Sequence, residues 1–80
     1  MIKYSKEAEK FILSQGKTAA IRLYHAIEKL PLGDVKRLQG KRNTPLYRLR
    51  VGDYRVLFCL ERDGITILRV DTRGDVYKRI

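Results

Sequence analysis

The residues of this chain best suited to chemistry are three arginines in the segment Tyr47–Phe58, namely Arg48, Arg50 and Arg55. The segment alternates polar and apolar residues on both sides of Gly52-Asp53, which is the pattern of a β-hairpin closed by a two-residue turn with glycine first. Such a turn fixes the register, so Arg50 should lie directly opposite Arg55. Because Arg48 is two positions from Arg50, it shares the same face. We therefore expect three guanidinium groups to crowd one face of a sheet.

This crowding of like charge predicts an anion-binding surface. Like charges that face each other across a strand pair are destabilising. The planar fork of arginine binds phosphate oxygens in pairs, so a surface that holds phosphate gains from the same arrangement. The alternative is a solvated basic face with no ligand. We interpret the cluster as a phosphate-binding surface.

The composition indicates one small, basic, folded domain, residues 1–80. Hydrophobic residues make up 44% of the chain, which excludes a disordered protein, and the net charge is +9 with a pI of about 10.1. Basic residues occur in both halves of the chain, so the folded body itself is basic. A polyanionic partner is expected: nucleic acid first, an acidic protein second and a membrane surface third.

The single cysteine, Cys59, excludes an intramolecular disulfide and a multi-cysteine zinc site. It lies in an apolar strand, which favours a buried structural thiol over a nucleophile. We expect no metal and no cofactor. No apolar run approaches the roughly 18 residues of a spanning helix, and the N-terminus lacks a signal-peptide core. We therefore expect a cytoplasmic protein that does not engage a membrane.

The first half of the chain predicts a short strand and a helical hairpin. Met1–Tyr4 suits an edge strand, and Ser5 can cap a helix over Lys6–Ser14. Thr18 can cap a second helix that runs to about Leu30. The short connection predicts that the two helices are antiparallel. The spacing in Asp34–Leu38 predicts one more helical turn.

The second half predicts strands. A basic loop, Gly40–Pro45, precedes the arginine hairpin, and a turn at Asp63-Gly64 leads to a third strand, Ile65–Asp71. Asp75–Arg79 is expected to be a short fourth strand or an extended tail. The fold class is therefore α+β: a short N-terminal strand, then an antiparallel helical hairpin packed on one face of a three- to four-stranded antiparallel sheet.

The hairpin registers assign the residues of the strands to two faces. The face that meets the helices is almost wholly hydrophobic and carries Tyr47, Leu49, Val51, Tyr54, Val56, Phe58, Leu60, Ile65 and Ile67. The opposite face carries the three arginines and an apolar half made of Leu57, Cys59, Leu68 and Val70. With no third layer to cover it, this apolar half should be exposed or covered by a partner.

Three segments together resemble the RelE/ParE superfamily of bacterial and archaeal toxins: Val35–Gly40, Tyr47–Arg55 and Arg73–Lys78. The resemblance covers nearly the whole chain and is closer to the RelE branch, so it implies a RelE-like fold. It implies the toxin of a type II toxin–antitoxin pair, inhibited by a co-expressed antitoxin. It also implies a ribosome-dependent endoribonuclease, an mRNA interferase, that cleaves mRNA in the ribosomal A site by metal-free attack of a 2′-oxygen on phosphate.

The resemblance also implies roles for individual residues. Arg48 and Arg50 match basic strand residues that contact the scissile region, and Arg55 matches a phosphate-binding arginine. Arg73 and Tyr77 match the arginine and tyrosine of the C-terminal motif; the tyrosine stacks on a base and assists proton transfer in active members. These five residues form the expected catalytic set. The expected RNA-binding set contains Lys41, Arg42, Arg48, Arg50, Arg55 and Lys78.

The chain departs from the active members at the proton acceptor. Lysines are usual at the positions of Arg48 and Arg50, and a histidine is usual at the position of Thr72. Arginine stays protonated, with a pKa above about 12, so it is a poor general base. The arginines therefore indicate phosphate binding, whereas cleavage also needs a separate proton acceptor.

Two other functions remain open at this point. ParE-like members of the superfamily poison DNA gyrase and are not nucleases. A catalytically weak module whose main activity is binding an acidic antitoxin is the other alternative. In either case Leu57, Leu68 and Val70 are expected to form part of the antitoxin-binding surface. His25 is expected to be exposed on the second helix, and Tyr47 and Tyr54 to be aromatic residues at the edge of the core.

Overall fold

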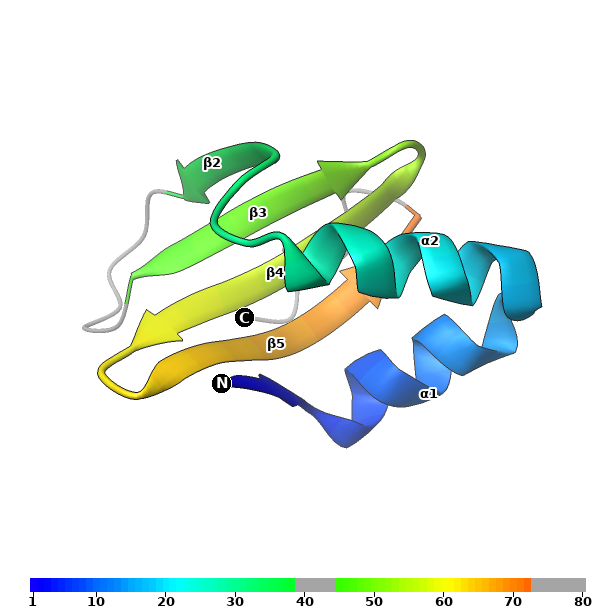
Figure 1. The fold of residues 1–80 in the computed structure, drawn as a ribbon, viewed down its shortest axis with the longest axis horizontal. Coiled ribbons are helices and arrows are strands. Elements are labelled where there is room, and N and C mark those ends of the chain that lie inside the picture. The colour runs from blue at the N-terminus through cyan, green and yellow to red at the C-terminus, as the bar shows by residue number, and fades with distance from the viewer. Residues whose placement is uncertain (39–44, 73–80) are drawn as a thin grey trace.

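The computed structural model describes residues 1–38 and 45–72 as two helices packed on one face of a mixed five-stranded sheet (Figure 1). The elements are β1 (Ile2–Tyr4), α1 (Lys6–Ser14), α2 (Lys17–Glu28), β2 (Asp34–Leu38), β3 (Leu46–Val51), β4 (Tyr54–Glu61) and β5 (Gly64–Asp71). The order of strands across the sheet is β1-β5-β4-β3-β2. The predicted α+β class is confirmed, with more strands than expected.

The two helices follow the predicted pattern closely. Helix α1 spans the predicted residues, and the Ser5 side chain accepts a hydrogen bond from the backbone N–H of Ala8 at 3.0 Å. Helix α2 starts two residues earlier than predicted. Its N-cap is Gly16, which makes no side-chain cap, so Thr18 lies inside the first turn. Gly16 has φ +93°, a backbone conformation that glycine tolerates best, and this ends α1 and begins α2 without a long loop.

The segment Asp34–Leu38 forms an edge strand, β2, and the prediction of a helical turn there is wrong. It pairs antiparallel with β3, with Val35 opposite Leu49 and Leu38 opposite Leu46. The apolar spacing of Val35 and Leu38 fits one helical turn. In β2, however, the two side chains point to opposite faces, and each joins a different apolar cluster. The long-range pairing with β3 therefore overrides the local spacing.

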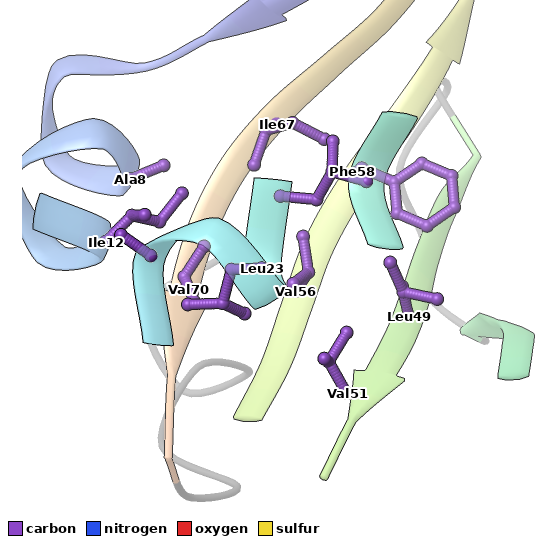
Figure 2. Close-up of a cluster of buried hydrophobic side chains, with 11 residues drawn as sticks. Ala8, Ile12, Leu23, Leu49, Val51, Val56, Phe58, Ile67 and Val70 are labelled. Atoms are coloured by element: carbon purple, nitrogen blue, oxygen red, sulfur yellow. The ribbon is translucent and has the colours of Figure 1, made fainter. Parts of the chain in front are cut away.

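The main core lies between the helices and the sheet (Figure 2). Ala8 and Ile12 of α1 and Leu23 of α2 point toward the strands, and each is fully buried. Facing them from the sheet are the buried side chains of Leu49, Val51, Val56, Phe58, Ile67 and Val70. Tyr47 and Tyr54 pack against this core from partly buried positions, which confirms that they are aromatic residues at its edge.

A β-bulge in β5 corrects the predicted face of Val70. Phe58 pairs with Ile67, but Leu57 pairs with Arg69, so Leu68 is one extra residue in β5. The extra residue shifts the alternation of side chains. Val70 therefore turns into the core beneath the helices, where it is buried, and does not share a face with Leu57. The β4–β5 turn is also one residue earlier than predicted, because Glu61 pairs with Gly64.

Candidate nucleic-acid interface

The register between β3 and β4 brings the three arginines together on the sheet face that the helices leave open. Arg50 pairs directly with Arg55, and Arg48 pairs with Leu57. The predicted hairpin register is therefore confirmed. The turn between the strands has glycine first, and Gly52 has φ +59°, as a two-residue hairpin turn of this kind requires. Local turn geometry thus fixes the relative positions of the guanidinium groups.

Two carboxylates flank the arginine pair, which the sequence reasoning missed. Asp34 of β2 pairs with Arg50, and Asp71 of β5 pairs with Arg55, so one row across four strands reads Asp34, Arg50, Arg55, Asp71. Opposite charges on neighbouring strands are stabilising. The row therefore offsets part of the repulsion between the two arginines. The sequence did not place Asp34 beside Arg50, because Val35 and Leu38 at helical spacing do not reveal that residues 34–38 pair with β3.

Arg48 lies deeper than its neighbours. Its side chain is 14% exposed, and its Nη2 lies 3.7 Å from Oδ1 of Asp34, whose side chain is 62% exposed. Arg50 is exposed and Arg55 is partly buried. Neither Arg50 nor Arg55 forms an ion pair with a carboxylate of residues 1–38 and 45–72. Arg48 is thus held in place by a neighbouring strand, while Arg50 presents its charge to solvent.

The apolar half of this face forms a second cluster. Leu46, Leu57 and Cys59 are buried, and Leu38 and Leu68 pack against them from partly buried positions. Leu57 is only 2% exposed, so the expectation that it lies open at the surface is wrong. Leu68, the extra residue of the bulge, keeps part of its side chain accessible. Of the three residues expected to bind an antitoxin, Leu68 is the one whose side chain is partly accessible.

Cys59 is a structural thiol, as the sequence predicted. It is buried, and its Sγ donates a hydrogen bond to Oε1 of Glu61 at 3.5 Å. Burial raises the pKa of the Cys59 thiol, and the neighbouring Glu61 carboxylate raises it further. Both effects disfavour the thiolate, which is the nucleophilic form. This thiol therefore does not supply the missing proton acceptor.

Several expected site residues lie outside the described part of the chain. These are Lys41 and Arg42 of the basic loop, Arg73, Tyr77 and Lys78 of the C-terminal motif, and the expected strand Asp75–Arg79. We call the open face of the sheet that carries Arg48, Arg50 and Arg55 the arginine face. These three are the expected catalytic and RNA-binding residues that the structure describes. His25 lies on the exposed surface of α2, as predicted.

Two further features were looked for in the described residues: a metal-binding cluster and a membrane-spanning helix. Among residues 1–38 and 45–72, no three His, Cys, Asp or Glu side chains are grouped so as to hold a metal ion. In the same part of the chain, no helix has both the length and the apolar character that crossing a bilayer requires.

Comparison with known proteins identifies the family. Residues 2–77 match the family described as "ParE toxin of type II toxin-antitoxin system, parDE". The chain belongs to the ParE toxin family. This match covers nearly the whole chain, so the resemblance to the RelE/ParE superfamily is confirmed, and the ParE-family chain is a toxin of the type II toxin–antitoxin class. No curated protein sequence matches it significantly.

Two solved structures relate this ParE-family chain to the RelE branch. A chain in the crystal structure of the archaeal RelE–RelB complex from Pyrococcus horikoshii OT3 is 32% identical, with a TM-score of 0.72 over 91% of this chain and 93% of that one. A chain in the RelB–RelE antitoxin–toxin complex from Methanococcus jannaschii is 28% identical, with a TM-score of 0.69 over 95% of each chain. These similarities support a RelE-like branch for this toxin.

Proposed function

We propose that this toxin is a ribosome-dependent endoribonuclease that cleaves mRNA in the A site. The observation that carries the proposal is the arginine face, where Arg50 lies directly opposite Arg55 and Arg48 lies beside them, held by Asp34. Preorganised cations are the groups that stabilise negative charge as it develops on phosphate. The likeness to chains from two RelE–RelB complexes supports this target over others.

The proposed reaction uses the RNA's own 2′-hydroxyl and no metal. Its oxygen forms a bond to phosphorus while the bond from phosphorus to the 5′-oxygen of the next nucleotide breaks. The products are a 2′,3′-cyclic phosphate and a 5′-hydroxyl. The 2′-hydroxyl loses its proton and the leaving 5′-oxygen gains one. In this reaction Arg50 and Arg55 would bind the two non-bridging phosphate oxygens, where charge accumulates.

The proposed reaction also needs a group that accepts the proton of the 2′-hydroxyl. Arg48, Arg50 and Arg55 serve as cations, and a guanidinium group is a poor general base. Within the described residues, the carboxylates in the row of Arg50 and Arg55 are Asp34 and Asp71, while Glu61 lies farther along β4 on the same face and accepts hydrogen bonds from Cys59 and Thr66. Arg73 and Tyr77 remain part of the proposed catalytic set through their match to the RelE motif, with Tyr77 assisting proton transfer. Lys41, Arg42 and Lys78 extend the proposed RNA-binding set.

Mapping transcript 5′ ends after induction of the toxin tests this function. We expect cuts phased with codons, growth arrest, and loss of both in the variant Arg55→Ala. Arg62→Ala, in the exposed β4–β5 turn, removes an arginine away from the site and serves as the control. Growth arrest without codon-phased cuts would contradict the proposed nuclease.

The two similar structures are complexes with an antitoxin, and we propose that this chain also binds a cognate antitoxin. On the face of the sheet that carries the arginines, Leu68 is a partly exposed apolar residue through which such contact would occur. Leu57 would support it from beneath. The variant Leu68→Asp should weaken antitoxin binding if it remains folded.

A ParE-like inhibitor of DNA gyrase is the second candidate function, because the matching family is described as ParE toxin. Induction of the toxin would then activate DNA-damage signalling while transcripts stay intact. The same induction experiment therefore separates the two functions.

A further inference from the structure

Strand β2, at the edge of the sheet beside β3 (Figure 1), adds a lysine to the arginine face. Lys36 pairs with Arg48, and residues that pair directly on neighbouring strands share a face of the sheet. The packing of β2 agrees, because Leu38 joins the apolar cluster of the open face and Val35 joins the main core. Lys36 is two residues from Leu38, so its exposed side chain lies on the arginine face.

Lys36 also keeps its charge free for a ligand. Three other basic side chains of this face each form an ion pair: Lys3 with Asp63 at 3.8 Å, Arg48 with Asp34 at 3.7 Å and Arg69 with Glu7 at 3.6 Å. Lys36, like Arg50 and Arg55, has no carboxylate partner of this kind among residues 1–38 and 45–72. These three side chains lie around Arg48 and retain donors for an added anion.

The arginine face therefore carries two directly opposed pairs of cations, in neighbouring rows. Arg50 and Arg55 face each other across β3 and β4, and Lys36 and Arg48 face each other across β2 and β3. Like charges in such positions are destabilising unless an anion joins them. Asp34 offsets the second pair only in part, because it contacts Arg48 but also faces Arg50 in its own row.

The spacing of the two pairs suits two neighbouring phosphates. They are offset by two residues along a strand and by one strand across the sheet, which together make about 8 Å. Successive phosphates along an extended RNA strand are separated by a comparable distance, and the flexible stem of lysine can take up the difference.

We propose that Lys36 and Arg48 bind a second RNA phosphate, next to the phosphate bound by Arg50 and Arg55. Contacts to phosphates position a nucleic acid without reading its sequence. Two adjacent contacts fix where the strand lies, so Lys36 is a positioning residue that determines which linkage reaches Arg50 and Arg55. This inference rests on RNA binding at the arginine face, as in the proposed function, but not on cleavage.

Salt titrations with single-stranded RNA compare Lys36 with its neighbour on β2. In Lys36→Ala the logarithm of the binding constant should fall less steeply with the logarithm of salt concentration, by about 0.7 for one lost phosphate contact. Arg37→Ala is the matched control, because Arg37 is also exposed but pairs with Tyr47 on the helix side of the sheet. It should leave the slope unchanged. Lys36→Arg keeps the cation and should retain the wild-type slope. Thermal melts followed by circular dichroism check that each variant is folded.

A short ligand separates a second phosphate site from a general effect of charge. The probe is a 2′-O-methylated trinucleoside diphosphate, which has two phosphates and no attacking hydroxyl. Its partner carries a neutral methylphosphonate in place of one phosphate. In magnetic resonance titrations, Lys36→Ala should raise the Kd of the fully charged probe by about threefold and leave that of the neutralised probe unchanged. Arg37→Ala should change neither.

Three outcomes would overturn the proposal: equal slopes for Lys36→Ala and Arg37→Ala, an equal loss of affinity for both probes in Lys36→Ala, or no RNA binding by the wild type. Failure of the nuclease gives a different result. The expected differences without codon-phased cuts in cells would support the second phosphate site and refute only cleavage. Codon-phased cuts together with equal slopes would refute only the second phosphate site.

Discussion

Arg50 and Arg55 illustrate how a fold accommodates a pair of like charges. They face each other across β3 and β4, and the strands on either side supply Asp34 and Asp71 in the same row. The carboxylates reduce the cost of the pair when no ligand is bound. Since neither arginine forms an ion pair with a carboxylate of the described residues, both retain donors for phosphate oxygens. Asp34 and Asp71 thus offset part of the repulsion between the two arginines without occupying their hydrogen-bond donors.

At this residue scale, Arg50→Ala and Arg55→Ala should each remove one phosphate contact with single-stranded RNA. The logarithm of the binding constant then falls less steeply with the logarithm of salt concentration, by about 0.7 per lost contact. Fluorescence anisotropy over a series of salt concentrations measures this slope. Arg62→Ala removes the same charge from the exposed β4–β5 turn and should leave the slope unchanged. An identical change in all three variants would show that net charge alone binds RNA.

The Cys59 thiol should react slowly in the folded protein. Its burial and its raised pKa both limit the thiolate that an alkylating reagent attacks. We expect modification by iodoacetamide at pH 8 to be at least about tenfold slower than in the urea-unfolded chain. Mass spectrometry of timed samples measures both rates. Fast modification under native conditions would mean that the Leu46, Leu57 and Cys59 cluster opens readily.

At the scale of elements, the sequence correctly predicted the features that depend on interactions between neighbouring residues. The Ser5 cap, the extent of α1 and the Gly52-Asp53 hairpin are each set by a few adjacent residues, and the structure has them as predicted. The strand β2 and the face of Val70 depend on pairing with distant strands. Five residues with Val35 and Leu38 at helical spacing do not reveal that pairing. A one-residue bulge in β5 likewise leaves no mark in the polar–apolar pattern.

Ser5 connects two elements and should matter more than an ordinary helix cap. Its Oγ accepts from the Ala8 N–H and donates at 2.7 Å to the carbonyl oxygen of Leu68, the bulged residue. Ser5→Ala removes both hydrogen bonds and should lower the free energy of unfolding by about 1–2 kcal/mol. Urea denaturation measures the loss. Ser14→Ala, which removes an exposed hydroxyl bound to the Phe11 carbonyl, should cost clearly less; equal losses would contradict the bridging role.

At the scale of the whole molecule, the two faces of the sheet have different roles. The helices and one sheet face build the main core. The other sheet face holds the arginines beside a small apolar cluster. Strand β3 shows this division within three residues, because the Arg50 side chain lies on the open face whereas Leu49 and Val51 are buried in the main core.

Alkaline pH should destabilise the fold through Tyr4, which joins β1 to α2. Its ring packs edge-on against Tyr24 with centroids 5.4 Å apart. Burial first, and then the nearby Tyr24, Glu28 and Glu9, raise the pKa of Tyr4 to about 12. The unfolded chain, with a tyrosine pKa of about 10, loses this proton earlier. This contribution to stability is complete below about pH 10 and is lost as the pH rises toward about 12.

Urea denaturation from about pH 9 to pH 11.5 checks this prediction. The wild type should lose stability more steeply over that range than Tyr4→Phe, which has no proton to release at that position. The raised pKa of Tyr24 should leave some dependence on pH in the variant. Parallel curves for the two proteins would contradict a raised pKa at Tyr4.

The bulge at Leu68 changes which residues of β5, odd-numbered or even-numbered, lie on each face of the sheet. Before it, even-numbered residues of this strand lie on the arginine face; after it, the odd-numbered Arg69 and Asp71 do. A deletion of this single residue would let Arg69 follow Ile67 in regular alternation, so Arg69 and Asp71 would stay on the arginine face and Val70 would stay in the core. When relatives are aligned with this chain, a one-residue gap at Leu68 should therefore be interpreted as the loss of the bulge, with the same residues on each face beyond it.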